Sequence, residues 1–313
     1  MSLKIVEQIT WSHGRVFIHH RIIHGGLLPA VVESWFPHTN DSYGLLFEDD
    51  IELSPMYYAW VKMAVLRYRY LPVHALPCAS IPIFFFSNRY GDPRNKIPNM
   101  FGISLYQQKH LELPLDGRQP FNPRTLFSSS GLAHPTTPYL SQIPCSWGAV
   151  YFPEQWREFH DYLAVRLSGV SMAIDEDIVP GVRSNRWSKS WKKFFIELIF
   201  LRGYVMLYPN YDNFVSLSTN HLEVGSHVKT RSKAKQDLFL LPLMQLPKGQ
   251  KYDLLDLPYG TLPPLDQLPV LNLTGSLTSI EKIINTGRLR RDELTGCDNL
   301  TELDDIRSLM CNH

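Results

Sequence analysis

Apolar residues along this chain occur in two spacings. Short continuous runs predict buried strands, and runs with a three-to-four-residue period predict helices. The expected strands span 16–23, 45–47, 81–87, 101–106, 147–152 and 204–208. The expected helices span 27–35, 55–70, 153–167 and 191–202, with one more short helix near 280–284. Because strands and helices alternate along the chain, the pattern predicts an α/β fold with a mixed sheet flanked by helices.

Breaks in this pattern predict the domain organisation. Proline and glycine recur between 92 and 144, so long loops are expected there. Beyond 230 the chain becomes rich in leucine and proline and loses its periodicity. We therefore expect one α/β domain over 1–229 and an extended, partly disordered appendage over 230–313.

Composition excludes several classes of protein. The 313 residues are 44% hydrophobic, which is enough for a sizeable core, and the net charge of +1 gives no global field for nucleic acid. The four cysteines are widely spaced and form no Cys-x-x-Cys pair, which argues against a zinc site and a disulfide-rich scaffold. No secretory signal or membrane-spanning run is visible, so a cytoplasmic location is expected from the chain as written.

Three adjacent carboxylates follow the expected strand 45–47. Glu48, Asp49 and Asp50 would repel one another if they were partly buried, unless a cation lay among them. Carboxylate oxygens suit Mn²⁺ or Mg²⁺, and such ions often bridge a protein carboxylate to substrate phosphates. The alternative is a solvated acidic turn without a ligand. If the triplet lies at the end of a sheet strand, it occupies the usual ligand-binding edge of an α/β sheet.

Several segments in fixed order resemble family 2-like glycosyltransferases of the GT-A fold, which are distantly similar to N-acetylglucosaminyltransferase I. They are HGGLLPAVVESW (24–35), LFEDDIELSP (46–55), SWGAVY (146–151), LRGYVMLYP (201–209) and STNHLEVGSH (218–227). The resemblance extends over about 11–229. It implies a nucleotide-sugar donor (a UDP- or GDP-sugar), bound Mn²⁺ or Mg²⁺, and a glycan, lipid or protein acceptor. Enzymes of this kind also suggest the Golgi or endomembranes, although no entry signal is visible here.

The resemblance also implies roles for individual residues. Asp50 would ligate the metal, Asp49 would lie near the ribose or sugar of the donor, and Glu48 would support the loop. Gly25 and Gly26 are further candidates for donor binding.

Other donor-side candidates are histidine and arginine. His221 and His227 are candidate metal ligands, although a histidine is more often an ordinary surface or hydrogen-bonded residue. Arg186 belongs to a basic run that either clamps a diphosphate or forms a solvated face.

A catalytic base and an acceptor platform are harder to choose. Glu197 is the first candidate for the carboxylate that takes the acceptor proton, and Asp177 is the second. The alternative for Glu197 is an ion pair on its own helix. Trp147 and Trp187 are candidates for an acceptor platform, with core packing as the alternative.

One departure from the resembled family is large. GT-A domains usually open with a strand and loop that seat the nucleotide base, and only ten residues precede the matching segment here. We therefore expect weakened donor binding. A catalytically inactive glycosyltransferase-like fragment or binding module is the alternative to an active enzyme. A metal-dependent phosphoester hydrolase is a third hypothesis, although no His-x-His or His-x-Asp pair accompanies the acids.

Overall fold

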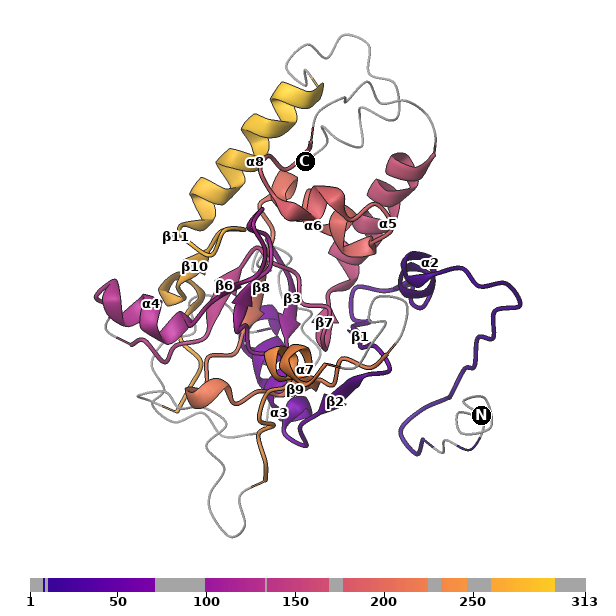
Figure 1. Cartoon of the computed structure of the whole chain (residues 1–313), viewed down its shortest axis with the longest axis horizontal. Coiled ribbons are helices and arrows are strands. Elements are labelled where there is room, and N and C mark those ends of the chain that lie inside the picture. Colours follow the sequence, from indigo (N-terminus) through magenta and orange to yellow (C-terminus); the bar gives the residue numbers. More distant parts are fainter. Residues whose placement is uncertain are drawn as a thin grey trace.

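The computed structural model is a mixed α/β structure in which helices flank a seven-stranded sheet (Figure 1). It describes residues 8, 11–70, 99–132, 134–168, 177–224, 232–246 and 260–295. The predicted α/β class is therefore confirmed. Among the helices in those ranges, none combines the length and the apolar character needed to cross a membrane.

The main sheet contains both parallel and antiparallel neighbours. Parallel pairing joins β3 to β8 and β6 to β10, and the other neighbours are antiparallel. In spatial order its strands are β1 (Gly44–Leu46), β7 (Ala149–Tyr151), β3 (Met100–Ser104), β8 (Val205–Tyr208), β6 (Tyr139–Ser141), β10 (Val270–Leu271) and β11 (Leu277–Thr278). Two small antiparallel sheets lie outside it: β2 (Ile51–Leu53) with β9 (Ser218–Asn220), and β4 (His110–Leu111) with β5 (Gln119–Pro120).

Helices pack on both faces of the main sheet. The α-helices are α2 (Leu27–Val32), α3 (Tyr57–Val65), α4 (Pro123–Ser129), α5 (Pro153–Leu167), α6 (Trp191–Arg202), α7 (Lys233–Phe239) and α8 (Ile280–Thr295). A π-helix, η1 (Leu66–Tyr70), continues α3, and short 3₁₀ helices are η3 (Arg183–Arg186), η4 (Asp212–Phe214) and η5 (Leu265–Gln267). The helix expected over 55–70 is thus present as α3 and η1.

Side chains of the central strands alternate between two cores, as the period of a strand requires. On β7, Tyr151 enters the core that α5 and α6 cover, whereas Val150 enters the core on the α3 side. On β8, Tyr208 and Leu207 divide in the same way. Both faces are therefore buried, which is why these strands read as continuous apolar runs in the sequence.

The two helices at the centre of the fold have the predicted boundaries. Pro153 starts α5, because proline lacks the N–H that a first turn leaves unpaired. Gly203 ends α6 in the left-handed conformation, with φ at 67°. The strands expected around 101–106, 147–152 and 204–208 are also present, as β3, β7 and β8.

The structure corrects the prediction for the first strand. Residues 16–23 belong to no strand, and Phe17 and Ile22 are 84% and 98% exposed. Figure 1 shows this part of the chain well away from the sheet. A strand needs a partner as well as a β-prone sequence, and none lies beside this segment among the described residues. The strand expected over 81–87 lies outside the described residues.

The acid-bearing strand also differs from its prediction. Residues 44–46 form a short, half-buried strand at the edge of the sheet, antiparallel to β7, rather than a fully buried strand. Since the carboxyl end of an antiparallel edge strand is not the usual ligand edge of a parallel sheet, the position of the acids has to be argued from their contacts.

The described residues 260–295 pack on the α/β domain, although the sequence predicted an extended appendage there. β10 and β11 extend the main sheet, and the helix expected near 280–284 runs from Ile280 to Thr295. This helix packs closely on α6: a Cβ placed on Gly287 would lie 2.3 Å from the carbonyl oxygen of Phe200. Sequence periodicity alone missed this packing because α8 has few apolar residues and relies on a small residue at the contact.

We predict that Gly287→Ala destabilises the protein. In an exposed helix this change stabilises by about 1 kcal/mol, but here the new methyl group meets backbone that cannot rotate away. A loss of about 1–3 kcal/mol in the free energy of unfolding is expected, measured by urea denaturation. Asn285→Ala, on the exposed side of α8, is the control and should change little. Equal stability of the two variants would show that α8 does not pack on α6.

Candidate functional site

The three acids Glu48–Asp50 form the turn between β1 and β2, called here the acid turn. The backbone N–H of Ile51 donates to the carbonyl of Glu48 and closes the turn at 3.2 Å. Pairing of β2 with β9 then fixes its far end, where the N–H of His221 donates to the carbonyl of Asp50. The side chains of Glu48 and Asp50 are half-buried, whereas Asp49 is exposed.

Asp50 is held by the residues that follow β9. The side-chain amide of Asn220 donates to its carboxylate at 3.3 Å. Burial raises the pKa of Asp50, a hydrogen bond from the backbone of Glu223 opposes this, and the charge of Asp49 raises it further. The pKa of Asp50 is therefore raised overall, because burial and negative neighbours outweigh the hydrogen bond that stabilises its carboxylate.

Glu48 is more strongly perturbed. Burial, together with the negative charges of Asp50 and Asp49, raises its pKa to about 7, although Lys192 acts in the opposite direction. Two carboxyl groups two residues apart therefore both have raised pKa values. A divalent cation between them would reverse that shift, as it does at other carboxylate sites.

Of the two candidate metal-binding histidines, the structure describes only His221. The Nε2 atom of His221 lies 2.8 Å from a carboxylate oxygen of Glu52, and both side chains are exposed beside the acid turn. The backbone of His221 is thus hydrogen-bonded to Asp50, while one nitrogen of its ring contacts the carboxylate of Glu52. His227 lies outside the described residues.

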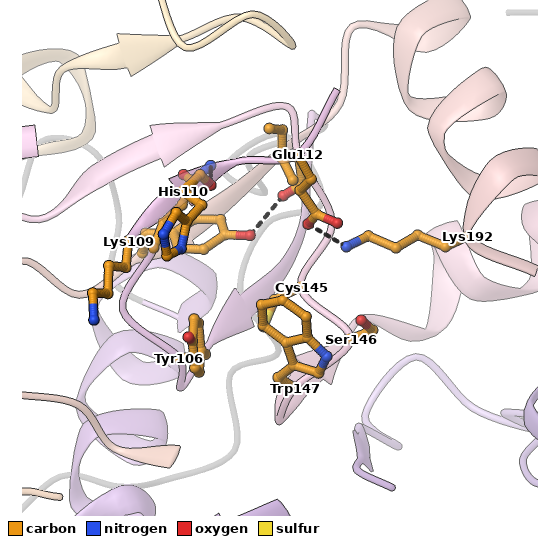
Figure 2. A pocket seen from close by; sticks show the side chains of 11 residues that line it. Tyr106, Lys109, His110, Glu112, Cys145, Ser146, Trp147 and Lys192 are labelled. Atoms are coloured by element: carbon orange, nitrogen blue, oxygen red, sulfur yellow. Dashed lines mark hydrogen bonds and ion pairs between the residues drawn. The ribbon is translucent and has the colours of Figure 1, made fainter. Parts of the chain in front are cut away.

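A recess adjoins the acid turn. It contains about 320 Å³ of space, including its open mouth, and lies between β4, the start of β7 and the start of α6. Its lining residues are Tyr106, Gln108, Lys109, His110, Glu112, Ile143, Cys145, Ser146, Trp147, Lys192 and Tyr208. Figure 2 shows Lys192 reaching toward Glu112 above the ring of Trp147.

Backbone contacts tie the recess to the acid turn. The hydroxyl of Ser218, on β9, donates to the carbonyl of Trp147 at 2.6 Å. Gly148 follows in the left-handed region, with φ at 92°, and a Cβ there would lie 3.0 Å from Ser218 and 3.7 Å from Ile51. The β2–β9 pair therefore packs directly on Trp147 and Gly148, the residues that lead into β7.

An ion pair forms one wall of the recess. The ammonium group of Lys192 lies 2.5 Å from a carboxylate oxygen of Glu112, with side-chain exposures of 8% and 12%. The same ammonium group lies 5.7 Å from the centre of the Trp147 ring. Lys192 also lowers the pKa of Glu48, so its charge acts on both the recess and the acid turn.

The proposed catalytic bases lie elsewhere. Glu197 is buried between α5 and α6, where it accepts hydrogen bonds from Tyr162 at 2.8 Å and from Arg166 at 3.0 Å. Glu197 is thus in an ion pair, but its nearest partner is Arg166 of α5, whereas Lys193 of its own helix lies 3.9 Å away. Asp177 is exposed, and its backbone carbonyl accepts a hydrogen bond from Arg290 of α8.

The remaining candidates are divided between the recess and the surface. Trp147 lines the recess, whereas Trp187 packs against the core beneath the guanidinium group of Arg183. Arg186 is exposed at the end of η3. Gly25 and Gly26 precede α2, and a Cβ on Gly26 would meet no atom within 4 Å.

A metal site at the acid turn would be partial. Among the described residues, no group of three histidine, cysteine, aspartate or glutamate side chains is arranged to hold a metal ion. The carboxylates of Glu48 and Asp50 nevertheless fit a hard cation by their chemistry and their raised pKa values. Such an ion would take its other ligands from phosphate oxygens and water, which is usual for Mg²⁺.

Sequence reasoning missed the pairing of Glu112 with Lys192. Glu112 lies in a proline-rich stretch without periodicity, and 80 residues separate it from its partner. Lys192 belongs to the basic run for which a diphosphate clamp and a solvated face are the alternatives. No local signal identifies such a pair, because only the packing of α6 against β4 brings the two residues together.

Comparison with known proteins gives one family. Residues 1–84 and 119–172 match the family model described as the SPBC1E8.03c C-terminal domain. The match covers less than half of the chain and includes the acid turn, α3, β7 and α5. No curated protein and no solved structure matches the chain. The description of the family names no reaction, so chemistry has to be argued from the residues.

We predict that Glu48→Gln changes how stability depends on pH. Because the pKa of Glu48 is raised to about 7 from 4.5, the folded state holds a proton that the unfolded state releases. In the wild type this group's contribution to stability therefore falls as pH rises between those values. Glu48→Gln removes the penalty, so its stability relative to wild type should improve by about 1–2 kcal/mol from pH 5 to pH 8.

Urea denaturation at both pH values measures this difference. Glu281→Gln, an exposed acid of α8, is the matched control and should follow the wild type. A wild type and a Glu48→Gln variant with parallel pH profiles would show that Glu48 is solvated.

Proposed function

We propose that this chain is a metal-dependent, inverting glycosyltransferase of the GT-A type. The reaction would move a sugar from a UDP- or GDP-sugar to an acceptor hydroxyl. One observation carries the proposal: Glu48 and Asp50 are both held in a half-buried turn that raises their pKa values. A cation bound at this turn would stabilise the ionised carboxylates, and a nucleotide diphosphate is a substrate that binds together with such a cation.

The chemistry of sugar transfer needs such a cation. As the bond between sugar and diphosphate breaks, negative charge grows on the departing phosphate. A divalent ion held by Asp50, with Glu48 beside it, would neutralise that charge. Asp49 is exposed at the tip of the turn, where it is free to contact the donor. The acceptor would bind at the mouth of the neighbouring recess, where Trp147 forms one wall.

The fold is compatible with this proposal. The resemblance to GT-A enzymes implies a mixed sheet flanked by helices, and the acid turn here follows β1 of such a sheet. The proposal assigns no catalytic role to Glu197, whose carboxylate is held by Tyr162 and Arg166.

A catalytically inactive binding module is the second candidate. The observation in its favour is the state of the two predicted bases: Glu197 is buried in its ion pair, and Asp177 lies beside α8. A domain that keeps the acid turn but has lost a base would bind a nucleotide without transferring sugar.

We predict that Mn²⁺ is required for binding of UDP or GDP, and that Asp50→Asn abolishes this binding. Isothermal titration calorimetry with each nucleotide, in Mn²⁺ and in EDTA, measures it. Thermal unfolding gives an independent readout, because a ligand at about 100 times its Kd stabilises the folded state by about 2.7 kcal/mol. Asp266→Asn, an exposed acid in η5, is the control and should bind as the wild type does.

Release of UDP distinguishes the active enzyme from the inactive binding module. An enzyme bound to a UDP-sugar and Mn²⁺ should release UDP when an acceptor is supplied, and the binding module should not. Absence of nucleotide binding at every Mn²⁺ concentration, with Asp50→Asn unchanged from wild type, would reject the metal site in both candidates.

A further inference from the structure

The recess beside the acid turn is surrounded by cationic side chains. Lys109 and Lys192 line it, and the charges of Arg118 and Arg183 act on its lining residues His110 and Glu112. Glu112 is the one carboxylate among the lining residues. Four cations around one acid leave a clear excess of positive charge.

The β4–β5 hairpin gathers these charges. Its register places His110 opposite Pro120 and Leu111 opposite Gln119, so Arg118 lies in the connecting loop above the recess. The N–H of Arg183 donates to the carbonyl of Leu113, which brings η3 against the same hairpin.

Aromatic rings hold both guanidinium groups in place. Arg118 lies 4.9 Å from the centre of the Phe239 ring, and Arg183 lies 5.7 Å from that of Trp187. Such contacts fix the position of a cation without neutralising it.

The excess charge has no partner among the described residues. Glu112 is taken by Lys192, and neither Arg118 nor Arg183 has a carboxylate of the described chain within 4 Å. The Nε atom of Arg183 is buried and has no hydrogen-bond partner there. A buried donor of this kind costs about 1–3 kcal/mol unless something accepts from it.

Titration of the neighbouring groups agrees with this geometry. Burial lowers the pKa of Arg183, and the charge of Arg118 lowers it further. Burial also lowers the pKa of His110, and Lys109 and Arg118 add to that shift. Part of each shift therefore comes from neighbouring cations, which agrees with a concentration of positive charge beside the recess.

We propose that this recess binds an anionic group, a phosphate or a carboxylate, carried by the sugar of the acceptor. The inference deepens the proposed function, on which it rests, by naming the acceptor class as a sugar phosphate or a sugar acid. Arg118 and Arg183 would bind the anion, and Trp147 would contact the sugar ring. Lys192 keeps the carboxylate of Glu112 from repelling the ligand.

The donor diphosphate is the competing source of an anion. The acid turn repels a bare diphosphate and accepts it with a divalent cation, whereas the recess needs no metal. Binding in EDTA therefore distinguishes the recess from the donor site.

The test titrates the protein with glucose 6-phosphate, glucuronate, inorganic phosphate and neutral glucose, all in EDTA. Binding is followed by calorimetry and by tryptophan fluorescence. We expect the charged sugars to bind and glucose to bind at least tenfold more weakly. Arg118→Gln and Arg183→Gln should each weaken the charged sugars about tenfold, and Arg288→Gln, an exposed arginine of α8, should not.

Three outcomes would overturn the inference. They are equal binding of glucose and glucose 6-phosphate, no loss in either arginine variant, and a metal-free UDP complex that displaces the sugars and depends on the same arginines. Circular dichroism checks that each variant is folded. Loss of Mn²⁺-dependent UDP binding in Asp50→Asn with sugar-phosphate binding intact would separate failure at the acid turn from failure at the recess.

Discussion

Burial of neighbouring carboxylates that cannot move apart is the constraint on which the site depends. Glu48 and Asp50 are two residues apart in a closed turn, and β2–β9 pairing fixes one end while β1–β7 pairing fixes the other. Solvent would stabilise both charges if the turn were free, but both side chains are half-buried. The turn therefore stores unfavourable electrostatic energy that a bound cation would release.

Much of the fold could be predicted from the sequence, especially the elements that are buried by neighbours on more than one side. The boundaries of α5 and α6 followed from Pro153, Gly203 and the apolar runs between them. Prediction was wrong at 16–23, whose β-prone residues lack a partner strand, and incomplete at α8. In both cases the outcome depends on neighbours that are distant in sequence and leave no local period.

The site was predicted unevenly for the same reason. Adjacent acids are visible in a sequence, so the acid turn was identified from Glu48–Asp50 alone. Glu197 was chosen by its position relative to Gly203, and no sequence pattern showed that Tyr162 and Arg166 would surround its carboxylate. The recess was missed entirely, because its charges come from a hairpin, a 3₁₀ helix and α6, and their proximity is a property of the fold.

Lys192 connects the two halves of the site through its charge. Its ammonium group is paired with Glu112 and also lowers the pKa of Glu48, so it is shared between a recess that lacks anions and a turn that lacks cations. A single buried lysine cannot satisfy both, since its attraction falls with distance and its ammonium group lies against Glu112. A metal at the turn and an anion in the recess would each supply what Lys192 provides only in part. The opposite charge deficits of the turn and the recess are the physical reason to expect two ligands rather than one.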